Sequence, residues 1–395
     1  MRRIALAVAA AIAGCGPAIP AVPSKGGPAW HELTSEHFTL WTDASESTAR
    51  ELVRHMEDLR QAVVGIGFRR ANASGRSLVV ALRDDDEVQA FMPRGDFAAI
   101  ASPSSSVVAQ PMILLSANPE HDPKGEIAAH ELTHTISASV IRDQPRWFAE
   151  GLAKFFETIE IDRGRGTIDL GRAPTYRGEP LVMHHMTSLA KLFACKDLGC
   201  ADASFYVTAW ALFTYLFNKY PQQLTQYEDR LAAGTPDRTT AWASAFGGIS
   251  NETLEQEMRD WLRSGSHLVL HFTGKLPEPA IHETTLGDAD VHAARAVLRL
   301  EFQGLTDAAK IEIEAALAVD RTNVLARFLA YQIDRTIDVS VAREIAAAHP
   351  DDWHAWFLVA KAASDDDEVR AAMAKTCTLI GANPAIVPPW QPCPQ

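Results

Sequence analysis

The sequence predicts an α+β fold in which a small sheet with helices, over residues 30–270, is followed by an all-α region, residues 291–395. Residues 36–42 alternate polar and apolar side chains, which is typical of a strand with one buried face. Residues 45–64 carry an apolar stripe at helical spacing. The last hundred residues are rich in alanine and form amphipathic segments joined by short turns. A content of 47% hydrophobic and 22% charged residues is that of an ordinary globular protein.

The N-terminus predicts export and a lipid anchor. Residues 1–14 combine two arginines with a short apolar run, as a bacterial signal peptide does. The next residue, Cys15, completes a segment that resembles the lipobox, in which the cysteine becomes lipidated. We therefore expect residues 15–29 to be a tether that holds the protein in the bacterial cell envelope. Gly16, and not the Asp that often marks retention in the inner membrane, follows Cys15, so we expect the outer membrane. An ordinary signal peptide is the alternative.

The elements of the first region follow from their apolar periodicity. Pro111 lies within the third expected strand and predicts that this strand forms a sheet edge, where an extended peptide could add by main-chain hydrogen bonds. The expected strands, helices and loops are strand 77–82, helix 84–91, loop 93–106, strand 107–116, helix 125–141, helix 145–157, loop 159–182, helix 205–220 and helix 254–262.

The last region is separated by an expected linker, residues 271–290, with Gly, Pro and polar breaks. Pro350 and Pro384 stand at corresponding turns 34 residues apart, a spacing that resembles tetratricopeptide repeats and indicates a protein partner on these helices. A plain helical bundle is the alternative. The expected helices are 293–317, 324–333, 339–348, 353–363 and 368–380.

Charge and cysteine usage narrow the class further. A formal net charge of −13 argues against a nucleic-acid partner, because binding to phosphates depends on Lys and Arg. Besides Cys15 the chain has four cysteines, an even number that predicts disulfides in an exported protein. The short separations favour the pairs Cys195–Cys200 and Cys377–Cys393. A metal site is the rival, but Cys195 and Cys200 have neither the usual spacing nor a nearby histidine.

The segment His130-Glu131-Leu132-Thr133-His134 carries the chemistry. On a helix the two histidines project from one face a turn apart, so both imidazoles can reach one zinc ion. Glu131 points about 100° around the helix. It can therefore lie beside a water on the metal and serve as general base without being a ligand.

A second acidic residue completes the expected site. Glu150 stands among Trp147, Phe148 and other apolar residues, where a carboxylate is costly to bury unless it is paired or bound to a metal. The motif with Pro145 to Ala153 resembles the peptidase MA-like gluzincins, a resemblance that spans about residues 30–265. It implies one Zn²⁺ per chain held by His130, His134 and Glu150, but it implies no substrate. Our first hypothesis is a zinc peptidase that acts on a peptide or protein substrate.

The chain departs from the thermolysin-like pattern at one position. Lys154 stands where an Asp supports a zinc histidine, so another acceptor must do this, and Glu157 is the candidate; pairing of Glu157 with Lys154 is the alternative. For the donor to the oxyanion we choose Tyr206 as the second catalytic residue beside Glu131, since Tyr215 belongs to the core. The rival functions are an inactive envelope adaptor that binds a protein partner, and a hydrolase of a non-peptide amide.

Overall fold

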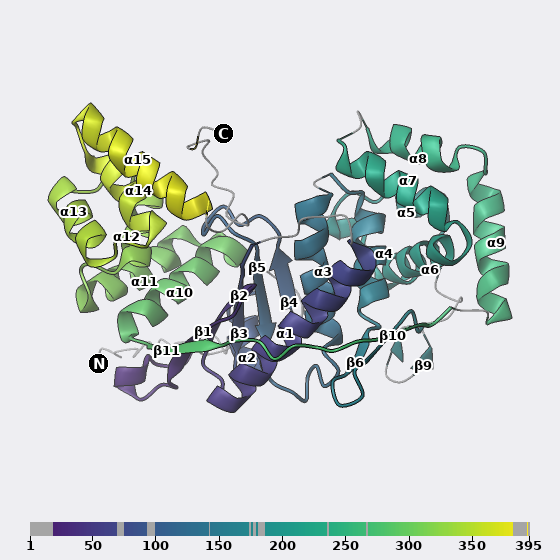
Figure 1. Cartoon of the computed structure of the whole chain (residues 1–395), viewed down its shortest axis with the longest axis horizontal. Coiled ribbons are helices and arrows are strands. Elements are labelled where there is room, and N and C mark those ends of the chain that lie inside the picture. The colour runs from purple at the N-terminus through teal and green to yellow at the C-terminus, as the bar shows by residue number, and fades with distance from the viewer. Residues whose placement is uncertain are drawn as a thin grey trace, which may run out of the picture.

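The computed structural model describes residues 19–68, 75–92, 99–141, 143–173, 175–176, 179–180, 186–234, 237–265, 268–381 and 393. The expected signal peptide (residues 1–14), Cys15, the first residues of the tether and Pro384 lie outside these described residues. The chain is α+β, with a mixed sheet at the centre and helices on both sides of it (Figure 1).

The central sheet has six strands in the order β11-β1-β2-β3-β5-β4. The strands β2, β3 and β5 are parallel to one another, while β1, β4 and β11 run antiparallel to their neighbours. Their bounds are β1 Trp30–Thr34, β2 Phe38–Thr42, β3 Ser77–Leu82, β4 Ala99–Ser102, β5 Met112–Ser116 and β11 His282–Leu286.

Both faces of the sheet are covered, because alternate side chains of each strand point to opposite sides. In β3, Val79 and Ala81 join one core with α1 (Glu46–Gly67) and α3 (Glu126–Val140). Leu78 and Val80 join a second core with the helices that follow residue 287. A strand that is buried on both faces needs apolar side chains at every position. The first four residues of β5 are all apolar and buried, as this requires.

The helices of the last region therefore share a core with the sheet. Phe328 and Phe357 lie fully buried in the same cluster as Leu78 and Leu114. The structure confirms that this region is helical. Its elements are α10 Asp288–Leu298, the π-helical turn η4 Arg299–Gln303, α11 Thr306–Val319, α12 Val324–Asp334, α13 Val339–Ala348, α14 Trp353–Ala362 and α15 Asp366–Gly381. The expected single helix 293–317 is interrupted at Gly304, whose φ of 64° ends η4.

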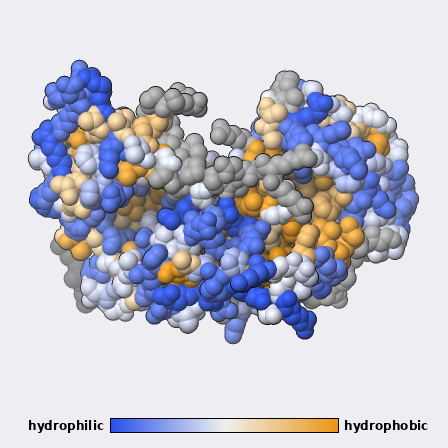
Figure 2. Space-filling view, in the orientation of Figure 1, coloured by the Kyte–Doolittle hydropathy of each residue, from blue (hydrophilic) through white to orange (hydrophobic). Residues whose placement is uncertain are grey.

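A second group of helices stands on the other side of the sheet (Figure 1). The strongly apolar α6 packs against α4 and is buried along most of its length. The elements are α4 Arg146–Phe156, α5 Leu189–Ala194, η3 Leu198–Cys200, α6 Ala203–Lys219, α7 Pro221–Ala232, α8 Arg238–Phe246 and α9 Asn251–Ser264. Figure 2 shows a mostly hydrophilic front surface and a notch in the outline between this group and α12–α15.

The prediction that residues 107–116 form an edge strand is wrong. The strand β5 begins only at Met112 and lies between β3 and β4. Pro111 precedes β5, so its missing N–H leaves the ladder intact, and its carbonyl accepts a hydrogen bond from the Leu78 N–H at 2.9 Å. The edge position belongs to β4, which lies within the segment 93–106 that we expected to be a loop.

Two further expected connections also contain regular structure. The expected linker 271–290 includes β11, which pairs with β1 along its whole length. The expected loop 159–182 includes the antiparallel pair β6 (Glu160–Asp162) and β7 (Thr167–Leu170), and β10 (Leu270–Thr273) pairs with β7. The short strands β8 (Thr175–Tyr176) and β9 (Glu179–Pro180) pair with each other.

The described part of the expected tether is packed on the domain. Val22 is 3% exposed and belongs to the second core. The short helix η1 (Pro23–Lys25) follows, and the N–H of Ser24 donates to Asp288 at 3.1 Å. Arg295 donates to the carbonyl of Pro20 at 2.8 Å. An apolar residue among the prolines thus anchors residues that composition alone assigns to a spacer.

Candidate metal site

The helix α3 presents two histidines on the face opposite its buried side. Ala129 and Leu132 are buried against α1 and the sheet, so the remaining face of α3 turns toward α4. Gly125 begins the helix with a φ of 71°, and a Cβ there would lie 1.8 Å from Nε2 of His55 on α1. The left-handed φ favours glycine at this position, and a larger residue would also have to displace the His55 side chain.

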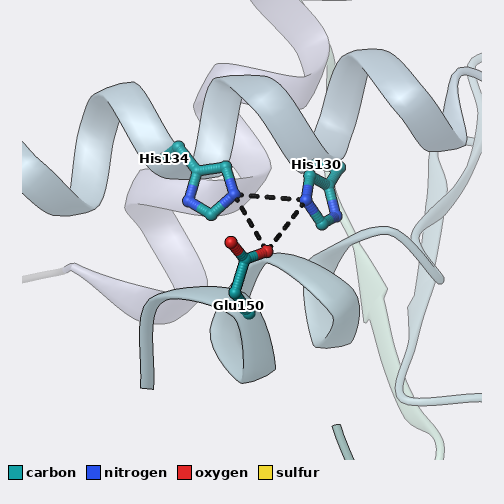
Figure 3. Close-up of side chains that lie close together, drawn as sticks. All are labelled: His130, His134 and Glu150. Atoms are coloured by element: carbon teal, nitrogen blue, oxygen red, sulfur yellow. Dashed lines mark hydrogen bonds and ion pairs between the residues drawn. The ribbon is translucent and has the colours of Figure 1, made fainter. Parts of the chain in front are cut away.

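His130, His134 and Glu150 form a compact triangle between α3 and α4 (Figure 3). The two Nε2 atoms lie 3.1 Å apart, and Oε2 of Glu150 lies 3.5 Å from each of them. Tetrahedral zinc with bonds of about 2.0–2.1 Å separates neighbouring ligand atoms by about 3.3–3.4 Å. The spacing of the three atoms therefore fits one ion of this size. It is the only cluster of three or more such ligands that the described part of the chain contains.

Close packing of α4 against α6 fixes Glu150. The next residue is Gly151, where a Cβ would lie 2.5 Å from the carbonyl oxygen of Ala209 on α6. Trp147 and Phe148 bury the same segment of α4, and Glu150 itself is 8% exposed. This contact explains why a glycine follows the carboxylate, since any larger residue would move α4 relative to the histidines.

The electrostatics of the triangle favour an ionised carboxylate. Burial raises the pKa of Glu150, but hydrogen bonds to the two imidazoles outweigh it and hold the pKa well below its usual range. Burial lowers the pKa of His130, yet Glu150 and Glu157 raise it to about 9. A bound cation would replace these protons, because metal ligands must be deprotonated imidazoles and carboxylates.

Glu157 supports His130 from behind. Its carboxylate lies 2.9 Å from Nδ1 of His130, which leaves Nε2 for the triangle. Lys154 also pairs with Glu157, at 2.6 Å. The two alternatives for Glu157 are therefore both realised: it binds the histidine and the lysine at once. Burial raises the pKa of Glu157, but both partners together hold it below its usual value.

The other two expected site residues lie close to the triangle. Glu131 is half-buried, and its charge acts on both His130 and Tyr206. Tyr206 is half-buried in the first turn of α6. Burial and then the charge of Glu150 raise the pKa of Tyr206, and a hydrogen bond with Arg146 opposes this rise. Tyr206 is therefore within electrostatic reach of Glu150, while Tyr215 is buried and bonds to Glu257 at 3.0 Å.

Sequence reasoning missed one residue of the site. Arg146 donates from Nη2 to Oε1 of Glu150 at 3.1 Å, one helical turn earlier on α4. The position gave a usable indication, because a cation in the first turn of a helix is disfavoured by the helix dipole and needs another reason to be there.

The comparisons with known proteins assign no activity. Residues 126–237, which include α3, α4 and α6, match a family model described as "Protein of unknown function (DUF1570)". No curated protein matches the chain.

Two further expectations concern covalent structure and location. The disulfides Cys195–Cys200 and Cys377–Cys393 are both present and confirm the predicted pairing. Disulfides are typical of proteins outside the reducing cytosol. No helix among the described residues is long and apolar enough to cross a bilayer.

Proposed function

We propose that the chain is a zinc-dependent peptidase of the gluzincin type. The observation that carries this proposal is the triangle of His130, His134 and Glu150 at ligand spacing, with Glu157 bonded to the far nitrogen of His130. A histidine ligand that is oriented by a carboxylate is the usual arrangement in catalytic zinc sites. Three protein ligands leave a fourth position for water or substrate, which distinguishes a catalytic site from a closed structural one.

The residues around the triangle supply the remaining steps. When bound, zinc acts as a Lewis acid that polarises the scissile carbonyl and acidifies water. The Glu131 carboxylate accepts a proton from the attacking water and returns it to the nitrogen of the leaving amine. Tyr206 donates its hydroxyl proton in a hydrogen bond to the oxygen of the tetrahedral intermediate.

A peptide substrate agrees with the edge of the sheet. The strand β4 is the last strand of the described sheet on the side where α3 packs. An extended peptide can add to such an edge by main-chain hydrogen bonds and so lie along the metal helix. We propose this role for β4 in place of the strand at 107–116.

We also propose that the protein works in the bacterial cell envelope. The two disulfides support an oxidising compartment, and a lipid on Cys15 would hold the packed domain at the outer membrane. A partner that binds the C-terminal helices stays a proposal, and it would have to use surfaces other than those that cover the sheet.

The test separates metal binding from catalysis. The purified protein should contain one zinc per chain and cleave members of a peptide library. Glu131→Gln should keep the zinc and the melting temperature but lose at least about 10²-fold in kcat, because it cannot accept the proton. Glu126→Gln, the same change five residues earlier on α3, is the matched control and should keep activity.

Two outcomes would contradict the proposal. A Glu131→Gln variant with full activity would place the base elsewhere. A wild-type protein that binds zinc but cleaves no peptide would favour the inactive adaptor or a hydrolase of another amide.

A further inference from the structure

Arg146 stands at a position that helix energetics disfavour. It is the first residue of α4, where the unpaired N–H groups carry a partial positive charge. At the other end of the same helix, the carboxylate of Glu157 faces the partial negative charge of the carbonyls. Both charges are reversed relative to the dipole of α4, and both side chains contact the metal triangle. Their placement therefore supports the metal site, although it lowers the stability of α4.

The burial of Arg146 adds a second cost. Its side chain is 19% exposed, and its Nε finds no hydrogen-bond partner among the described residues. A buried donor without a partner is energetically unfavourable, because it has lost its hydrogen bonds to water. The ring of Phe205, whose centre is 6.0 Å from the guanidinium carbon, borders the same space. An arginine with only a structural role would be more favourable at a solvent-exposed position, where water accepts its hydrogen bonds.

The contact of Arg146 with Glu150 gives the two carboxylate oxygens of Glu150 different partners. Oε1 accepts the hydrogen bond from Nη2 at 3.1 Å, whereas Oε2 lies 3.5 Å from both imidazole nitrogens. An arginine at Oε1 competes with a metal for that oxygen. It therefore favours binding through Oε2 alone and keeps one more coordination position open.

We propose that Arg146 is a positioning residue that holds Oε1 of Glu150 and so makes Glu150 a one-oxygen metal ligand. This inference rests on the metal binding in the proposed function and is independent of peptide cleavage.

The experiment compares Arg146→Met and Arg146→Lys in the full protein, with Arg259→Met as control. Arg259 on α9 forms a pair with Glu255 at 2.9 Å and four residues apart, equally half-buried but with no contact to the triangle. Zinc affinity is measured by competition with a chelator, and the visible spectrum of the Co²⁺-substituted protein reports the coordination number. For Arg146→Met we expect about 10- to 100-fold weaker zinc binding, the range seen when groups that orient ligands are removed. We also expect a weaker cobalt absorption, because Glu150 then binds through both oxygens.

Arg146→Lys should restore part of the zinc affinity, because its ammonium group can still donate to Oε1 of Glu150.

Zinc affinity within twofold of Arg259→Met together with an unchanged cobalt spectrum would overturn the proposal and leave Arg146 a structural residue. If instead the wild type binds zinc and cleaves no peptide, the proposed function fails, while the zinc and cobalt measurements still decide the role of Arg146 at Glu150.

Discussion

The bond between Glu157 and His130 permits a quantitative prediction for Glu157→Gln. The carboxylate accepts from Nδ1 at 2.9 Å and is itself held by Lys154. A hydrogen bond to a charged group contributes about 1.5–3 kcal/mol and one between neutral groups about 0.5–1.5 kcal/mol. Glutamine keeps a neutral acceptor of the same size, so the change removes about 1–2 kcal/mol. Because about 1.4 kcal/mol corresponds to tenfold in Kd, zinc binding should weaken about 5- to 30-fold.

The assay is competition for Zn²⁺ with a chromophoric chelator at fixed pH, with the melting temperature recorded for each variant. Lys154→Met is the matched control, because it removes the other partner of Glu157 and leaves the bond to His130 in place. It should change the zinc Kd by less than about threefold, since the ion pair is partly exposed. Equal Kd values for Glu157→Gln and wild type would refute the view that this carboxylate orients the ligand.

Two further predictions concern stability. Gly151→Ala should lower the free energy of unfolding in urea by about 1–3 kcal/mol and weaken zinc binding, because the new Cβ meets the backbone of α6; Gly248→Ala, with open space around it, should do neither. Burial and the neighbouring carboxyl of Asp43 raise the pKa of Glu87 to about 8, against 4.5 as its ordinary value. The folded state then keeps a proton that the unfolded state has lost, so stability should fall as pH rises from about 4.5 to 8, and urea unfolding of Glu87→Gln should lack this slope.

The local parts of the site were predictable from sequence. The i and i+4 spacing of His130 and His134 needs only a helix to bring both imidazoles to one side, and the apolar surroundings of Glu150 left a metal as the natural partner. Glu157 could be named because it recurs two turns after Glu150 on the same helix. These inferences succeeded because the geometry of a single helix determines them.

Errors arose where the tertiary pairing decides. Pro111 suggested an edge strand, yet it precedes β5 and costs the ladder no hydrogen bond. The polar strand β11 looked like a linker because it forms the other edge of the sheet, where most of its side chains face solvent. Arg146 was missed although its charge in the first turn of α4 gave an indication, because only the structure shows its contact with Glu150 at the metal triangle.

The pairing of β11 with β1 has a consequence for the order of folding. Residues 30–34 are among the first of the domain to be made, and their partners at 282–286 follow only after α3, α4 and α6 are complete. Contacts so distant in sequence form late and make folding slow. The second core, which needs α10–α14, also waits for the end of the chain. We therefore expect α3 to gain its final support only after the whole chain has been made. Under the proposed export and peptidase function, hydrolytic capacity would then arise after translation, on the far side of the membrane.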